Sequence, residues 1–174
     1  MAKFEPAVEY VLEREGGWAN NPNDKGGPTN FGITLATAQR HADKFGKPNI
    51  RTAEQLKNMQ KQDAVAIYRL NYWLHDDIKD QRLATKIFDI GVNMGISAAT
   101  RLLQCVLFLR GAELSLDGKL GPKTIAAANS YRADDLLIEI GFALAGNYCR
   151  IVERDPSQIE FLKGWCNRAK KVPQ

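Results

Sequence analysis

The sequence predicts a mainly α-helical protein: a helical bundle with a long ordered loop or a small hairpin after the first helix. Apolar residues recur at helical spacing through most of the 174 residues, and no segment alternates as a half-buried strand does. One stretch, from Trp18 to Ile33, has no period and is dense in Asn, Gly and Pro, which favours turns. With 44% hydrophobic and 25% charged residues, the chain suits one compact domain, or one domain with a small appended lobe.

The first helix is expected from about Glu5 to Glu15. Its apolar residues recur at helical spacing: Phe4, Ala7, Val8, Val11 and Leu12. Glu15 lies three and four residues beyond Leu12 and Val11, so it continues the apolar side of the helix instead of the solvated face. Gly16 and Gly17 follow and are expected to end the helix.

Further helices are predicted along the rest of the chain. Thr34 can cap a second helix that ends at FGKP, and the capping box TAEQ at 52–55 opens a third that continues to Tyr72. Apolar stripes then predict helices over about 83–94, 98–109, 134–153 and 159–169, and Gly121-Pro122 is placed to begin another. Cys105 lies on the stripe of the 98–109 segment and is expected in the core.

The cysteines and histidines exclude several classes of site. Cys105, Cys149 and Cys166 are odd in number, far apart and set among apolar neighbours, which favours reduced core thiols over a disulfide framework. His41 and His75 have no Cys or His partner at the spacing of a zinc site, so we expect no metal ion and no cofactor. No histidine follows any cysteine, which disfavours a protease or amidase with the Cys-first order.

The net charge of +4 would suit a polyanionic partner such as nucleic acid or an anionic cell wall. Lys and Arg are scattered, however, with no basic arm, so solvated surface charge is the better interpretation and we expect no nucleic-acid partner. The charged start, MAKFEPAVEYVLEREGG, leaves no apolar stretch for a signal peptide, and no run reaches the roughly 18 apolar residues of a membrane span. We therefore expect synthesis as a cytoplasmic protein.

Glu15 and Asp24 are the first candidates for catalysis. A carboxyl group on the apolar side of a helix end loses hydration in its charged form, which raises its pKa and suits a general acid near neutral pH. Asp24, nine residues on, lies in a polar, turn-rich stretch that should leave it ionised. A glycosidase needs such a pair, one to protonate the leaving oxygen and one to assist water or the transition state. From these two residues alone, a surface Glu and a turn-forming Asp are the more ordinary interpretation.

The wider stretch EGGWANNPNDKGGPTNFGIT, at 15–34, resembles the opening motif of glycoside hydrolase family 108, N-acetylmuramidases of phage and bacterial origin. The likeness continues in IYRLNYW at 67–73 and IFDIGVNMG at 87–95, and LDGKLGPKTIAA at 116–127 is similar to the peptidoglycan-binding segment that follows in the family. The resemblance implies an α+β lysozyme-like fold, with a catalytic region over 1–95 and a helical peptidoglycan-binding region over 96–174 packed on it.

The resemblance also implies the reaction: a lysozyme that cleaves the β-1,4 bond between N-acetylmuramic acid and N-acetylglucosamine, with Glu15 as the catalytic acid. Phage-type lysozymes carry a Glu, eight residues, an Asp, five residues and a Thr. Here eight residues separate Glu15 from Asp24, and four separate Asp24 from Thr29. We expect Asp24 to stabilise positive charge or position water and Thr29 to help hold that water. The shorter spacing leaves Asn30 and Thr34 as alternatives to Thr29.

Five residues are predicted to bind the glycan: Asn30, Tyr72, Trp73, Asp89 and Asn93. Tyr72 and Trp73 would stack on sugar rings, although aromatics at helical spacing are more often core residues. Asp89 and Asn93, four residues apart, would either line the cleft or bond to each other on a helix.

Two alternative functions stay open at this stage. One is a lytic transglycosylase that uses the same Glu, and the other is a non-catalytic wall-binding or secretion-assisting protein. In each case the expected partner is peptidoglycan and the protein is expected to be a monomer. Since no signal peptide is seen, we expect it to reach the wall through a phage-type holin, as a prophage endolysin does, or through a dedicated transporter.

Overall fold

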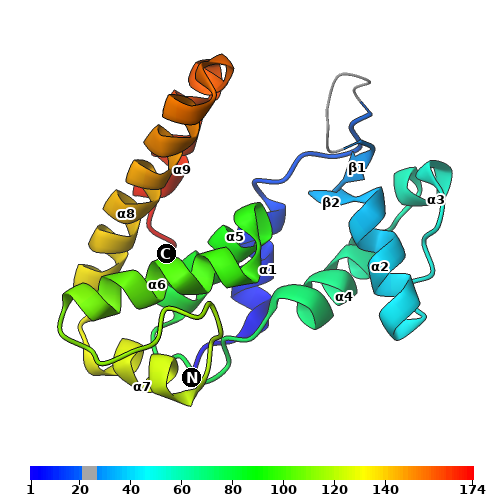
Figure 1. Ribbon diagram of the computed structural model, residues 1–174. Coiled ribbons are helices and arrows are strands. Elements are labelled where there is room, and N and C mark those ends of the chain that lie inside the picture. The colour runs from blue at the N-terminus through cyan, green and yellow to red at the C-terminus, as the bar shows by residue number, and fades with distance from the viewer. Residues whose placement is uncertain (21–26) are drawn as a thin grey trace. The chain divides into compact units, whose positions relative to one another are not determined.

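The computed structural model of the chain describes residues 1–20 and 27–174. It divides into two compact units, Phe4–Trp73 and Leu74–Gln174, the second with Met1–Lys3. Figure 1 shows that helices dominate both units and that a small two-stranded hairpin lies in the first. The predicted mainly α-helical fold, with a hairpin after the first helix, is confirmed.

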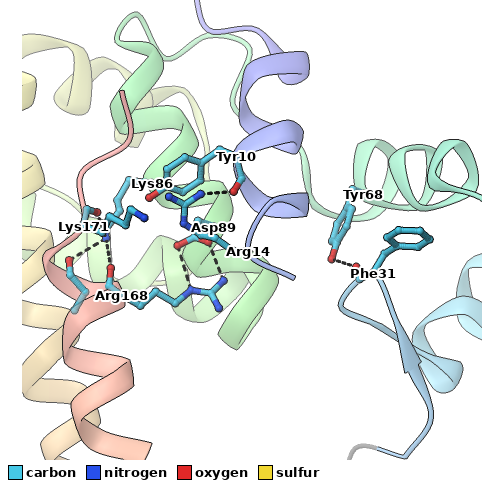
Figure 2. Close-up of polar contacts among 9 residues, drawn as sticks. Tyr10, Arg14, Phe31, Tyr68, Lys86, Asp89, Arg168 and Lys171 are labelled. Carbon is cyan, nitrogen blue, oxygen red and sulfur yellow. Dashed lines mark hydrogen bonds and ion pairs between the residues drawn. The ribbon is translucent and has the colours of Figure 1, made fainter. Parts of the chain in front are cut away.

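Helix α1 (Phe4–Leu12) buries the predicted apolar side, but it ends three residues before Glu15. In a continuing α-helix the Arg14 N–H would donate to the carbonyl of Tyr10. That carbonyl instead accepts from the Arg14 guanidinium, as Figure 2 shows, and the Arg14 N–H donates to Val11 O at 2.9 Å. The last turn is therefore tightened, and the prediction that Gly16 and Gly17 end the helix was wrong.

The first unit continues with β1 (Thr29–Asn30), β2 (Ile33–Thr34) and α2 (Leu35–Phe45). The predicted cap is confirmed, since the Thr34 hydroxyl accepts from the Thr37 N–H at 3.2 Å. The capping box at Thr52 is confirmed too, but the helix that it opens is only α3 (Ala53–Lys57). A separate helix, α4 (Lys61–Tyr72), begins after Gln60, whose N–H donates to the Asp63 carboxylate at 3.1 Å. The prediction of a single helix from Thr52 to Tyr72 was wrong. The capping interaction at Gln60 starts a separate helix instead.

The second unit contains α5 (Gln81–Met94), α6 (Ile96–Leu109), α7 (Pro122–Ser130), α8 (Ala133–Arg154), the short η1 (Pro156–Gln158) and α9 (Ile159–Lys170). Helix α5 is its centre, because every residue from Leu83 to Gly91 is buried. Helices α8 and α9 lie side by side as an antiparallel pair (Figure 1), and a Cβ on Gly141 would lie 3.0 Å from the Ala169 carbonyl. Across the described residues, no helix is both long and apolar enough to cross a membrane.

Two charged side chains of α5 connect it to the end of α9 (Figure 2). Lys86 is only 1% exposed, and its Nζ donates to three backbone carbonyls at 2.8–3.0 Å: those of Arg168, Ala169 and Lys171. One turn later, the Asp89 carboxylate accepts from the Arg168 guanidinium at 2.8 Å. A cation at the carbonyl end of a helix is favourable, and a buried charge is tolerated when its donors are satisfied. Both contacts stabilise the packing of α9 on α5.

The apolar stripe that the sequence predicts for α6, formed by Ala98, Leu102, Cys105, Val106 and Leu109, is rotated from the face that the helix buries. The buried residues are Ala99, Thr100, Leu103, Gln104, Val106 and Leu107, whereas Cys105 and Leu109 are exposed. Apolar residues occur on several sides of this helix, so their period did not select one face. Cys149 is exposed as well and Cys166 is half-buried, so the prediction of core thiols was wrong, although all three are free.

His75 should make the protein less stable in mild acid. The side chain is 2% exposed, and burial lowers its pKa from 6.5 to about 4 against the opposing charge of Asp76. The unfolded chain therefore binds this proton more readily, so the stabilisation is complete above pH 6.5 and is lost as the pH falls towards 4. We expect this residue to lower the free energy of unfolding by about 2 kcal/mol between pH 8 and pH 5.

Urea unfolding at pH 8 and pH 5, for the wild type and His75→Gln, measures this contribution. The Gln side chain does not titrate, so the pH-dependent loss should be smaller in the variant by that amount. Equal pH dependence in the two proteins would contradict the assignment to His75.

Candidate active site

Glu15 lies three residues beyond the end of α1 and packs against the hairpin. Its side chain is half-buried, and its N–H donates to Val11 O at 3.0 Å, as it would in a helix. The carboxyl group packs on Gly32: a Cβ built on that glycine would be 2.6 Å from Glu15 Oε2 and 2.7 Å from its Cδ. A Cβ at position 32 would therefore force the Glu15 side chain to move, and the carboxyl group uses space that the glycine leaves open.

The hairpin is built to present Gly32. Strands β1 and β2 pair in antiparallel register, Thr29 with Thr34 and Asn30 with Ile33, which leaves a two-residue turn of Phe31 and Gly32. Both turn residues have positive φ, 49° and 72°, as a type I′ turn requires. Phe31 adopts this conformation without being a glycine, so the surrounding contacts must hold it there.

Two buried side chains connect the hairpin to neighbouring helices. The Tyr68 hydroxyl on α4 donates to Phe31 O at 2.8 Å, as Figure 2 shows. The Asn30 amide, in a side chain 5% exposed, donates to the carbonyls of Leu56 and Lys57 at the end of α3, at 2.9 and 3.1 Å. Asn30 was predicted to bind the glycan or to hold water, and in this structure its amide nitrogen anchors the hairpin.

Thr29 also joins the loop that follows Glu15 to the hairpin. Its N–H and C=O exchange hydrogen bonds of 2.8 and 2.9 Å with Ala19, so the two ends of the loop between them are brought together. Asp24 belongs to this loop but lies outside the described residues, and its predicted role stays a prediction. The structure thus packs Glu15 against Gly32 of the hairpin, and Thr29 of the same hairpin pairs with Ala19.

Tyr72 and Trp73 occupy different environments at the end of α4. Tyr72 is half-buried, and its ring meets Tyr68 edge-on at 5.7 Å between centroids. Trp73 is 5% exposed and packs against Phe4 at 5.6 Å. In this structure Trp73 is a core residue of the first unit, and Tyr72 has the more accessible ring.

Asp89 and Asn93 lie on α5 in the second unit. Asp89 is 1% exposed and paired with Arg168, and Asn93 is exposed. The partner of Asp89 is therefore a residue of α9, far along the chain. The spacing of residues within α5 does not indicate such a partner.

The turn at 115–124 surrounds a pocket of about 280 Å³ in the second unit. The buried Gln104 donates to Asp117 at 2.9 Å and accepts from the Gly118 N–H at 2.9 Å. Hydrogen bonds from Gln104 and from the Lys119 N–H hold the pKa of Asp117 below its ordinary value. Lys119 and Lys123 also line the pocket, and α7 begins beside it at Pro122, as the sequence predicts.

Residues 8–95, half of the chain, match the family model described as Glycosyl hydrolase 108. The chain belongs to the glycosyl hydrolase 108 family. Residues 98–170 of this family member match a second model, described as a Predicted Peptidoglycan domain. The chain is therefore a glycosidase that acts on peptidoglycan. A search of curated proteins found no match.

Among solved structures, the glycosyl hydrolase 108 chain is similar to SagA of Brucella abortus, with 30% identity and a TM-score of 0.77. The similarity covers 95% of this chain and 88% of SagA. Within the chain, the two family segments meet near Gly95, whereas the compact units divide after Trp73. The difference arises because α5, which belongs to the first matched segment, packs with α6 and α8.

Proposed function

We propose that the protein is an N-acetylmuramidase that cleaves the β-1,4 bond between N-acetylmuramic acid and N-acetylglucosamine, with Glu15 as general acid. The observation that carries this proposal is the Glu15 carboxyl, half-buried after α1 and packed on Gly32. A general acid must keep its proton at a defined point beside the leaving oxygen. The two-residue turn against which the carboxyl group packs supports such a point.

The proposed reaction assigns each residue one task. Glu15 transfers its proton to the glycosidic oxygen as the bond from that oxygen to the anomeric carbon of N-acetylmuramic acid breaks. Asp24 stabilises the oxocarbenium-like transition state or orients the water, and Thr29 helps to hold that water. The water oxygen forms a bond to the anomeric carbon as one proton of that water passes to a carboxylate. One water is therefore consumed for each bond cleaved.

Inversion is the stereochemistry that we propose, from the order of Glu15, Asp24 and Thr29. An inverting enzyme holds its carboxyl groups roughly 6.5 to 9.5 Å apart, which leaves room for the water between them. A separation near about 5 Å would favour a covalent intermediate and retention.

Mass spectrometry of digested peptidoglycan tests the proposed bond and the use of water. We expect fragments that end in reducing N-acetylmuramic acid. Anhydro-muramic ends would instead identify a lytic transglycosylase, in which the same acid acts without an attacking water. Reducing N-acetylglucosamine ends would show that the other glycosidic bond is cleaved, and both outcomes would contradict the proposal.

A non-catalytic wall-binding or secretion-assisting protein is less well supported. The chain belongs to a family of glycosidases, and the Glu at position 15 and the glycine that it needs at position 32 are both present. We infer that residues 98–170 bind the wall and that the first unit, Phe4–Trp73, cleaves it.

A further inference from the structure

We propose that Tyr68 is a positioning residue for the Glu15 carboxyl, which it controls through the turn of Phe31 and Gly32. The inference rests on the proposed role of Glu15 as the general acid. It adds a residue outside the glycine-rich segment that determines where that acid lies.

The turn needs an external restraint. Phe31 has φ of 49°, a backbone conformation that residues other than glycine rarely adopt. Such a conformation persists where surrounding contacts determine it, and it relaxes when they are removed. The hydrogen bond from Tyr68 to the Phe31 carbonyl, at 2.8 Å, acts on the strained residue itself.

Tyr68 is suited to act as this restraint because it is itself fixed. The side chain is 1% exposed and lies within α4, where the ring of Tyr72 packs against it edge-on. A buried aromatic ring has few rotamers, so its hydroxyl marks a defined position relative to the helix. On the other side, Asn30 fixes the strand before the turn to the end of α3. The turn is thus held from two helices.

The contact between Gly32 and Glu15 transmits this restraint to the acid. The carboxyl lies within the space that a Cβ on Gly32 would occupy, so a shift of the turn removes the surface on which the carboxyl packs. Proton transfer requires the donor within hydrogen-bond reach of the glycosidic oxygen. A displacement of about 1 Å in such a position can lower a rate a hundredfold. Tyr68 therefore affects the chemical step without touching the substrate.

The test compares Tyr68→Phe with a matched control, Tyr131→Phe. The Tyr131 hydroxyl also donates to a backbone carbonyl, that of Arg110 at 3.0 Å, in the second unit. Each variant loses one hydrogen bond and keeps its ring. With soluble, uncrosslinked peptidoglycan strands as substrate, we expect Tyr68→Phe to lower kcat about tenfold with KM unchanged within about twofold. Tyr131→Phe should retain the kcat of the wild type, with a similar small shift in thermal midpoint.

A second measurement separates positioning from a general loss of stability. Gly32→Ala also displaces the Glu15 carboxyl, so adding Tyr68→Phe to it should lower kcat by much less than it does in the wild type. Adding Tyr131→Phe to Gly32→Ala should change nothing further.

Two results would overturn the inference: kcat of Tyr68→Phe equal to that of Tyr131→Phe, or losses from Tyr68→Phe and Gly32→Ala that multiply in full. These differ from a failure of the proposed function, which full activity of Glu15→Gln would reveal.

Discussion

Glu15→Gln should lower the rate of peptidoglycan hydrolysis by about 10² to 10⁴ fold, the contribution of a general acid. The amide keeps the size and shape of the carboxyl group, so it can still pack on Gly32, but it has no acidic proton to give to the leaving oxygen. The rate of clearing of purified wall suspensions measures the loss. Wall binding, followed by co-sedimentation, should be unchanged because residues 98–170 are untouched.

Glu13→Gln is the matched control. Glu13 is exposed and lies two residues earlier in the same turn, so the substitution removes the same charge from the same segment. We expect it to keep the activity of the wild type. Clearing by Glu15→Gln at the rate of Glu13→Gln would show that Glu15 is not the acid.

Gly32→Ala is expected to lower kcat by about ten- to a hundredfold, since a misplacement of about 1 Å is enough for such a loss. The new Cβ would lie 2.6 Å from Glu15 Oε2, and the flexible end of the Glu side chain is the group that can give way. The positive φ of 72° adds a folding cost of about 1 to 2 kcal/mol for a residue with a Cβ. Steady-state kinetics and urea unfolding should therefore show separate effects on activity and on stability.

Gly46→Ala distinguishes these two effects. Gly46 ends α2 with a similar φ of 79°, but a Cβ there would meet nothing within 4 Å. We expect it to lose similar stability and to keep the kcat of the wild type. If Gly46→Ala and Gly32→Ala lowered kcat equally, backbone strain would explain the loss, and the contact with Glu15 would not.

Local signals in the sequence were sufficient for much of the fold. Helical periodicity found the buried side of α1, and the hydroxyls of Thr34 and Thr52 indicated the starts of α2 and α3 because a cap depends on residues only three positions away. The same signals failed at the end of α1 and for the buried face of α6. Helix α1 ends at Leu12, where the Tyr10 carbonyl accepts from the Arg14 guanidinium, and the phase of α6 was ambiguous because apolar residues lie on several of its sides.

Contacts between distant residues could not be predicted. Lys86 looks like a surface residue in the sequence, and its acceptors are carbonyls more than 80 positions away. Asp89 was predicted either to line the glycan cleft or to bond to Asn93 on its own helix, and in the structure it accepts from Arg168.

The candidate site shows the same division. Helical periodicity predicted Glu15 on the apolar side, and its side chain is half-buried although α1 ends at Leu12; Gly32 lies within the motif at 15–34. The packing of that carboxyl on Gly32 appears only when the hairpin forms. Tyr68 carried no signal of its own, because an aromatic at helical spacing is usually a core residue. Tyr68 is a core residue, and its hydroxyl also donates to the Phe31 carbonyl in the turn.

Release of reducing N-acetylmuramic acid ends, counted by mass spectrometry for wild type and Glu15→Gln at equal amounts of wall-bound protein, tests most directly whether Glu15 is the acid of a muramidase. We expect the wild type to release these ends and Glu15→Gln to release them at least about a hundredfold more slowly. Equal release by the two proteins, or wild-type products without reducing muramic ends, would contradict that assignment.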